Sequence, residues 1–142
     1  DDGVERTNLL DFVNLEKLKQ GEVFYLGDLK ARCFSVDHIP HKPCFGISFD
    51  DRVFFTSDCV FSREKIESYL EAGAEIIFHD SNFDAWYPNA VHCNFKELSS
   101  LPREIAEKIV IMHYDDASSK EDFLRATDLG FRIAKCGERF SF

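Results

Sequence analysis

The sequence predicts an α/β fold in which a mixed β-sheet carries helices on one face, because the rhythm of the chain changes part-way along. Up to about residue 58, one apolar strand follows another, separated by turn signals such as Gly-Asp and Asp-Asp. After that point apolar strands alternate with helical segments, which is typical of βαβ crossovers. We therefore expect an antiparallel meander that continues into a parallel sheet.

The first part contains several short runs rich in β-branched and aromatic residues, each of strand length. The segment ahead of them, residues 14–21, is interpreted as a short helix that ends at Gly21. The expected strands cover residues 22–27, 30–36, 44–49 and 52–57.

Helix-start and helix-stop signals divide the second part of the chain. Ser62 can accept a hydrogen bond at the start of a helix over residues 63–72, and Gly73 would end that helix. Ser119 and Asp122 form the pattern of a capping box ahead of the last helix. The expected helices cover residues 63–72, 102–108 and 120–129. The strands expected between and after them cover residues 75–79, 109–113 and 131–136.

The length, hydrophobic content and net charge of the chain limit the classes of function that are compatible with it. A chain of 142 residues with 44% hydrophobic content can bury the core of one globular domain. The net charge of -9 argues against capture of a long phosphate backbone, which needs clustered Lys and Arg. A small phosphodiester or the end of a nucleic acid remains compatible with this charge if metal ions meet the phosphate.

The expected compartment is the cytoplasm. Five cysteines, an odd number without a CxxC pair, favour free thiols in a reducing environment. No apolar run approaches the roughly 20 residues that span a bilayer, and the first residues lack the features of a signal peptide, so we expect no membrane association. Because the chain begins with Asp1 and not Met, we expect a processed protein or a piece of a longer one.

Three successive apolar strands end in residues that bind metal ions well. Asp58 follows the first, His79 and Asp80 end the second, and His113 ends the third. Ligands and chemistry gather at the carboxyl ends of strands in α/β sheets, and carboxylate oxygen and imidazole nitrogen are ligands of zinc, manganese and iron. Any one of these residues alone is more often structural, and Asp58 alone would suit a helix cap. The repetition predicts a metal site.

The order of these motifs resembles the C-terminal half of the metallo-β-lactamase superfamily, in the style of its phosphodiesterase and tRNA 3′-processing ribonuclease branch. The matching stretches span about residues 22–142 and read, in order, DHIPHKPCFGISF, VFFTSDC, IIFHDS, VHCNFKELSSLP and IVIMHYDD. The resemblance implies that residues 1–142 form one half of a four-layer αββα sandwich, with a mixed sheet and helices on one face.

Carried onto this sequence, the resemblance assigns roles to individual residues. Asp58 would bridge two metal ions, and His113 would be a ligand of the second ion. His79 and Asp80 would assist proton transfer or steady the scissile phosphate, and His92 would act in the substrate site.

His38 resembles the histidine at the start of the H…FG strand and is a further candidate for the site, with His41 as its rival. The implied cofactors are two divalent transition-metal ions, with zinc preferred over manganese or iron. The implied reaction is hydrolysis of a phosphodiester by metal-activated water.

The superfamily's main metal motif, H-x-H-x-D-H, belongs to the N-terminal half, and this sequence contains no H-x-H. A lone half would expose an apolar sheet face that calls for a cover. We therefore expect a partner: either the N-terminal half as a separate or cleaved chain, or a homodimer mate.

Two other classes of function stay open. The missing motif favours a non-catalytic interaction module of the same fold. A cysteine-nucleophile hydrolase would use Cys59 or Cys93 with a neighbouring histidine. A structural zinc site made of His92, Cys93 and Cys136 ranks last, because its spacing matches no known pattern.

Two bulky aromatic residues, Trp86 and Tyr87, fall in the segment between His79 and His92, which we expect to be a loop. They either border the substrate mouth or pack against a neighbouring helix.

Overall fold

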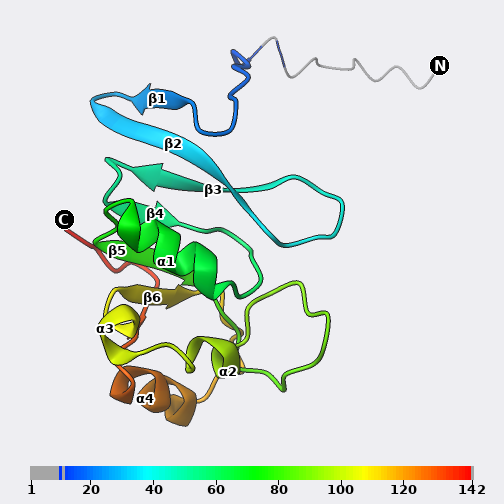
Figure 1. The fold of residues 1–142 in the computed structure, drawn as a ribbon, viewed down its shortest axis with the longest axis vertical. Coiled ribbons are helices and arrows are strands. Elements are labelled where there is room, and N and C mark those ends of the chain that lie inside the picture. The colour runs from blue at the N-terminus through cyan, green and yellow to red at the C-terminus, as the bar shows by residue number, and fades with distance from the viewer. Residues whose placement is uncertain (1–9, 11, 142) are drawn as a thin grey trace.

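One mixed sheet organises the chain in the computed structural model, which describes residue 10 and residues 12–141 (Figure 1). The strands lie in sequence order across a seven-stranded sheet. The first four pair antiparallel and the rest pair parallel, so the expected switch from meander to crossovers is confirmed. The strands are β1 (Val23–Leu26), β2 (Leu29–Val36), β3 (Cys44–Phe49), β4 (Val53–Phe55), β5 (Ile76–Asp80), β6 (Ile109–Met112) and β7 (Arg132–Ile133).

The helices begin where local capping chemistry allows. The Ser62 hydroxyl accepts a hydrogen bond from the Lys65 N–H, and Ser119 and Asp122 form a complete capping box, as predicted. A short helix after Asn94 was not predicted; Asn94 and Glu97 cap it in the same reciprocal way. The helices are α1 (Arg63–Glu71), α2 (Phe95–Leu98), α3 (Arg103–Ala106) and α4 (Lys120–Asp128).

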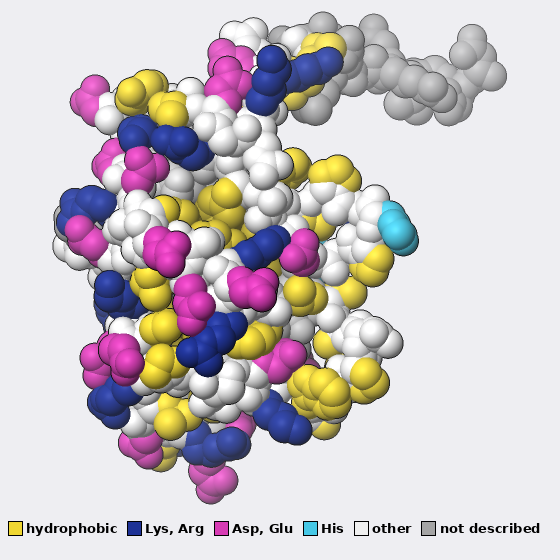
Figure 2. All heavy atoms as spheres, viewed as in Figure 1, with side chains coloured by type: hydrophobic (Ala, Val, Ile, Leu, Met, Phe, Trp, Pro, Cys, Tyr) yellow, Lys and Arg dark blue, Asp and Glu magenta, His cyan; other side chains and the backbone are white. Residues whose placement is uncertain are grey.

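All of these helices pack on the same face of the sheet. Each contributes to the core that contains Phe54, Ile77, Ile109 and Ile111 of the central strands. Side chains alternate between the two faces of a strand, so the intervening residues point the other way. Burial of each large side chain stabilises this layer by about 1.5–3 kcal/mol. On the side seen in Figure 2, acidic and basic side chains are interspersed over the outer surface of the helices.

The opposite face of the sheet is covered by none of the described helices. Its register brings Phe45, Ile47, Phe55 and Phe78 to one side, and the Phe55 and Phe78 rings lie 6.3 Å apart. Phe45 and Phe55 are 47% and 39% exposed. We call this surface the open face. Phe140 packs on the Phe78 part of this face, with the ring centres 4.9 Å apart, and exposed apolar surface elsewhere on it is typical of sites of association.

The helix expected over residues 14–21 is wrong. This segment is non-helical and exposed, and it is tied to β2 by hydrogen bonds from the Gly21 N–H to the Cys33 carbonyl and from the Gln20 amide to the Ser35 hydroxyl. A helix this short is marginal without a surface to pack on, and none of the described elements provides one.

The helix expected over residues 102–108 ends early, at Ala106, because the Lys108 carbonyl accepts the Ile77 N–H and already belongs to the sheet. In the described part of the chain, every helix is too short or too polar to traverse a lipid bilayer.

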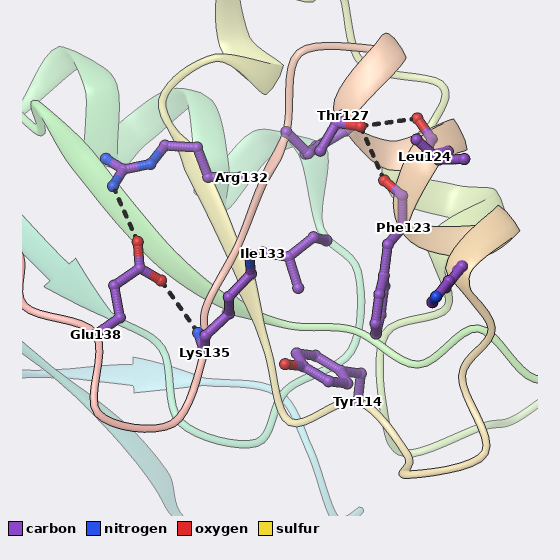
Figure 3. Close-up of a pocket in the computed structure, with 10 residues that line it drawn as sticks. Tyr114, Phe123, Leu124, Thr127, Arg132, Ile133, Lys135 and Glu138 are labelled. Atoms are coloured by element: carbon purple, nitrogen blue, oxygen red, sulfur yellow. Dashed lines mark hydrogen bonds and ion pairs between the residues drawn. The ribbon is translucent and has the colours of Figure 1, made fainter.

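A cavity of about 520 Å³ lies between α4 and β7, and Tyr114, which follows His113, forms part of its wall (Figure 3). Phe123, Leu124 and Ile133 form much of its apolar wall. It is lined by none of the sequence-predicted metal-binding residues, so its size alone does not make it the functional site.

Replacing Gly46 with Ala should lower the free energy of unfolding by about 1–3 kcal/mol. The added Cβ would lie 2.5 Å from the Phe34 ring and 2.7 Å from the Phe55 carbonyl oxygen. Urea denaturation measures the loss. Adding Phe34→Leu removes the ring contact and should recover part of it in a double-mutant cycle, and purely additive losses would contradict the steric explanation.

Candidate metal centre

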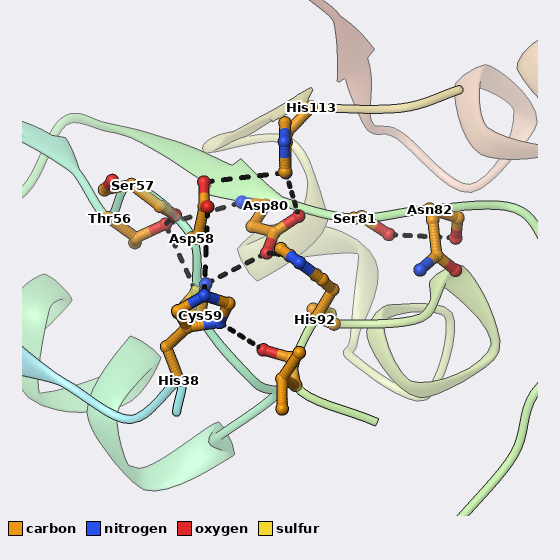
Figure 4. Close-up of polar contacts among 12 residues, drawn as sticks. His38, Thr56, Ser57, Asp58, Cys59, Asp80, Ser81, Asn82, His92 and His113 are labelled. Carbon is orange, nitrogen blue, oxygen red and sulfur yellow. Dashed lines mark hydrogen bonds and ion pairs between the residues drawn. The ribbon is translucent and has the colours of Figure 1, made fainter. Parts of the chain in front are cut away.

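Five polar side chains converge where the carboxyl ends of β4, β5 and β6 meet two long loops (Figure 4). Asp58 follows β4, Asp80 ends β5 and His113 follows β6. His38 comes from the loop after β2, and His92 from the loop before α2. The parallel register of β4 to β6 accounts for the convergence, because it brings the three strand ends to one edge.

Asp58 lies between two imidazoles. Its Oδ2 is 3.9 Å from Nε2 of His38, and its Oδ1 is 3.6 Å from Nδ1 of His113. The N-cap of α1 is Ser62, so Asp58 does not perform the alternative helix-capping role. A carboxylate with each oxygen turned towards a different imidazole is suited to bridging two cations.

His38 has one ring nitrogen engaged by the backbone. Its Nδ1 lies 2.6 Å from the Val91 carbonyl oxygen. Since a carbonyl can only accept, Nδ1–H donates, and the lone pair of Nε2 remains on the side of Asp58. This backbone contact fixes the tautomer that a metal ligand needs. His41, the rival candidate, is exposed in the loop.

Asp80 is 0% exposed and has three polar neighbours. Its Oδ2 accepts the Cys59 backbone N–H at 2.9 Å and lies 2.7 Å from Nδ1 of His92. Its Oδ1 lies 3.2 Å from Nδ1 of His113. An ionised carboxylate only accepts, so Nδ1 of His92 donates to Asp80 and Nε2 takes no part in this bond.

The structure does not bring His79 to this cluster. Alternation along β5 turns it to the helix-covered face, opposite to Asp80. There it is buried, with Nδ1 2.7 Å from its neighbour's carbonyl oxygen and Nε2 3.7 Å from Sγ of Cys59. Burial lowers the pKa of His79, which keeps the imidazole neutral.

Two overlapping groups of side chains have ligand atoms within 4.8 Å of one another among the described residues. One is His38, Asp58 and His92, and the other is Asp80, His92 and His113. Nitrogen and oxygen donors of this kind suit zinc, manganese or iron.

The family model for the anti-Pycsar protein Apyc1 matches residues 1–139 of the chain. The chain belongs to the anti-Pycsar protein Apyc1 family.

Individual Apyc1 proteins agree with this assignment. The Apyc1 of Paenibacillus sp. (strain J14) is 33% identical over 133 residues, which cover 87% of this chain and 53% of that protein. The Apyc1 of Paenibacillus harenae is 34% identical over 88 residues, which cover 62% of this chain and 36% of that protein. The chain spans about half the length, or less, of the curated relatives it matches.

Solved structures confirm the predicted metallo-β-lactamase fold. The metallo-β-lactamase fold protein YhfI of Bacillus subtilis is similar with a TM-score of 0.63 and 18% identity, over 85% of this chain and 53% of that one. A diphosphatase of the PhnP family is similar with a TM-score of 0.66 and 19% identity, over 87% and 47%. The single sheet of this Apyc1-family chain thus corresponds to half of the sandwich.

Two asparagines that sequence reasoning missed hold the His92 loop of this Apyc1-family chain. The Asn94 amide donates to Oδ1 of Asn82 at 2.8 Å and to the Asp84 carbonyl at 2.9 Å. The backbones of Asn82 and Asn94 also form an isolated parallel bridge. This link holds the base of the loop beside β5, where His92 meets Asp80. Asn94 followed three residues later by Glu97 is a capping pattern that could have revealed the start of α2 after the loop, although not the bond to Asn82.

The cysteines do not resemble nucleophiles. Cys59 and Cys93 are buried, and burial raises the pKa of Cys59 to about 12 and that of Cys93 well above its usual range. Reactive cysteines have the opposite profile, with a depressed pKa and an accessible sulfur. Neither of the metal-holding groups among the described residues includes a cysteine.

Iodoacetamide at about pH 8 should modify Cys136 and leave Cys59 and Cys93 intact, because Cys136 is exposed while Cys59 is buried and only about 10⁻⁴ ionised. Peptide mass spectrometry after timed alkylation measures this. The urea-unfolded chain, in which every cysteine should react, is the control. Alkylation of Cys59 as fast as Cys136 would revive the cysteine-nucleophile alternative.

Proposed function

We propose that this chain is the C-terminal half of a metal-dependent hydrolase that cleaves a phosphodiester bond with water, and that it becomes active when a second half completes the metal centre. The observation that carries the proposal is Asp58, whose two oxygens face His38 and His113, beside the pair formed by buried Asp80 and half-buried His92.

The donor set fits two divalent transition-metal ions, with zinc preferred over manganese or iron. Asp58 would bridge the two, with His38 on one side and His113 on the other. Bound in this way, such a pair lowers the pKa of a water molecule and supplies a nucleophile near neutral pH. The chain's own contribution is to fix these side chains: the Val91 carbonyl orients His38, and Asp80 lies against His113.

His92 is the proposed proton donor to the leaving oxygen. Asp80 accepts from its Nδ1, which stabilises the protonated ring and leaves Nε2 as the site of proton transfer. Asp80 is thus a positioning residue. We assign no direct catalytic role to His79, because it lies on the other face of β5.

A second half is required because the chain offers too few ligands for two ions. Zinc in catalytic sites takes three protein ligands and an open position, and His38, Asp58 and His113 would have to serve both ions. Asp80 lies on the same face of β5 as Phe78, the open face, so a partner covering that face reaches the centre. The proposed partner is the N-terminal half, as a separate or cleaved chain, or a homodimer mate.

The substrate that we propose is a small phosphodiester or a nucleic-acid end. The net charge of -9 disfavours a long duplex. Relatives of similar sequence are anti-Pycsar proteins, and we propose the same role for the completed protein. A protein of similar fold is a diphosphatase of the PhnP family. The five free cysteines suit the reducing cytoplasm.

Asp58→Asn should reduce the bound metal and slow hydrolysis of bis(p-nitrophenyl) phosphate by at least about 100-fold, since the bridging charge is lost. Elemental analysis and a steady-state assay of the chain with its co-purified second half measure both effects. Asp116→Asn, at an exposed loop position, is the matched control. An Asp58 variant with unchanged metal content and rate would contradict the proposal. Wild-type protein without metal or turnover, with all partners present, would support the interaction module.

His92→Asn should lower the turnover number by about 10²–10⁴-fold, because the proton donor to the leaving oxygen is lost. His41→Asn, in an exposed loop, provides the comparison and should behave like the wild type. Equal rates for the two variants would remove His92 from the mechanism.

A further inference from the structure

The cavity between α4 and β7 has the size of a small-molecule site and lies outside the candidate metal centre, none of whose five side chains lines it (Figure 3). Its volume of about 520 Å³ falls within the roughly 300–1,000 Å³ typical of such sites. Phe123 and Leu124 of α4 form one apolar wall, and Phe131 and Ile133 form the other. Water against apolar walls has few hydrogen-bond partners, so an apolar group that displaces it gains affinity.

Contacts within the chain hold the walls of this cavity in place. The Tyr114 hydroxyl donates to the Ala134 carbonyl at 2.6 Å, and the Tyr114 ring lies edge-on to the Phe123 ring with the centres 5.0 Å apart. Phe131 and Ile133 are 2% and 9% exposed and belong to the core. The cavity is therefore largely pre-formed, and a ligand that enters it has to order few side chains.

The α4 side of the cavity offers apolar surface and no free hydroxyl proton. Leu124 lines the cavity and is 61% exposed, so the chain itself leaves this side chain uncovered. The Thr127 hydroxyl donates to the carbonyls of Phe123 and Leu124 at 3.0 and 2.9 Å. Its proton is thus engaged by the helix backbone. Selection among apolar ligands has to come from the charged residues of the wall.

These charged residues leave a surplus of positive charge. Lys120, Arg132 and Lys135 line the cavity together with one carboxylate, Glu138. Glu138 lies 3.7 Å from the Arg132 guanidinium and accepts the Lys135 backbone N–H at 3.1 Å. Among the described residues, no ion pair includes the ammonium group of Lys120 or Lys135. Two unpaired cations beside an apolar cavity are complementary to an anion with an apolar body.

We propose that this cavity binds an amphipathic carboxylate, a molecule of the chemical class of medium-chain fatty acids, with one apolar chain and one negative charge. The apolar chain packs between Leu124 and Ile133, and the carboxylate accepts hydrogen bonds from the lysine ammonium groups at the rim. The inference is independent of the proposed function, because it uses none of the metal-binding side chains.

The test follows methyl resonances of the cavity wall. The chain, ¹³C-labelled at its Leu and Ile methyl groups and combined with any second half that co-purifies, is titrated with decanoate and, separately, with decan-1-ol, below micelle-forming concentrations. The two probes share the alkyl chain and differ in charge. Both should shift the Leu124 and Ile133 resonances, and decanoate should bind about tenfold more tightly, through two exposed charge contacts. Leu26, an exposed leucine of β1, is the control resonance and should stay unmoved.

Variants test the contribution of each part of the cavity. Lys120→Gln combined with Lys135→Gln should weaken decanoate about tenfold and leave decan-1-ol within about twofold, because only the charge is lost. Lys108→Gln, at an exposed position between α3 and β6, is the matched control and should change neither affinity.

A further variant fills the cavity. Thr127→Phe places a ring in the cavity from an exposed position of α4 and should abolish binding of both probes. Phe and Thr have similar helix propensities, so α4 should be retained. An unchanged Leu26 resonance and an unchanged circular dichroism spectrum would report the intact fold.

Four results would overturn the inference. Equal affinities for the two probes, or lysine variants that match the wild type, would remove the recognition of an anion. Probes that leave Leu124 and Ile133 unmoved would remove the site. A Leu26 shift with the same affinity as the Leu124 shift would mean non-specific apolar binding. A Leu124 resonance that ignores both probes and moves when the second half is removed would make the cavity a contact surface for that half.

Discussion

The buried carboxylate of Asp80 is the interaction on which the rest of the site depends. It joins segments that are far apart in the sequence: the turn after β4 through the Cys59 N–H, the loop before α2 through His92, and the end of β6 through His113. A buried carboxylate without partners is strongly unfavourable, so these contacts stabilise one another. The arrangement of the site is therefore coupled to the folding of the parallel half of the sheet.

The backbone conformation at two strand ends also helps to bring the side chains of the site together. Ser57 and His113 have φ angles of 58° and 60°, in the left-handed region that residues with a Cβ rarely adopt. Each lies at or next to a proposed metal-binding residue, where the chain has to turn sharply as it leaves the sheet. Such conformations persist only where the surroundings enforce them, and the contacts of Asp80 are part of those surroundings.

Much of the fold could be predicted because its signals are local. The switch from antiparallel to parallel strands follows from spacing, and the starts of α1 and α4 follow from Ser62 and from Ser119 with Asp122. The helix expected over residues 14–21 was wrong because a short helix needs a packing surface, which a local pattern does not reveal. The parallel register explains why residues at three strand ends converge, but nothing local predicted the Asn82–Asn94 link.

The sequence by itself determined the α/β class, the succession of strands and helices along the chain and the presence of His and Asp side chains at one sheet edge, because caps, turns and alternation depend on near neighbours. Only the tertiary structure decided which of these side chains act together. It separated His79 from Asp80 across β5 and brought His38 and His92 to the two carboxylates from separate loops. The physical reason is that the direction of a side chain follows from strand alternation, whereas convergence depends on register and on hydrogen bonds between segments distant in sequence.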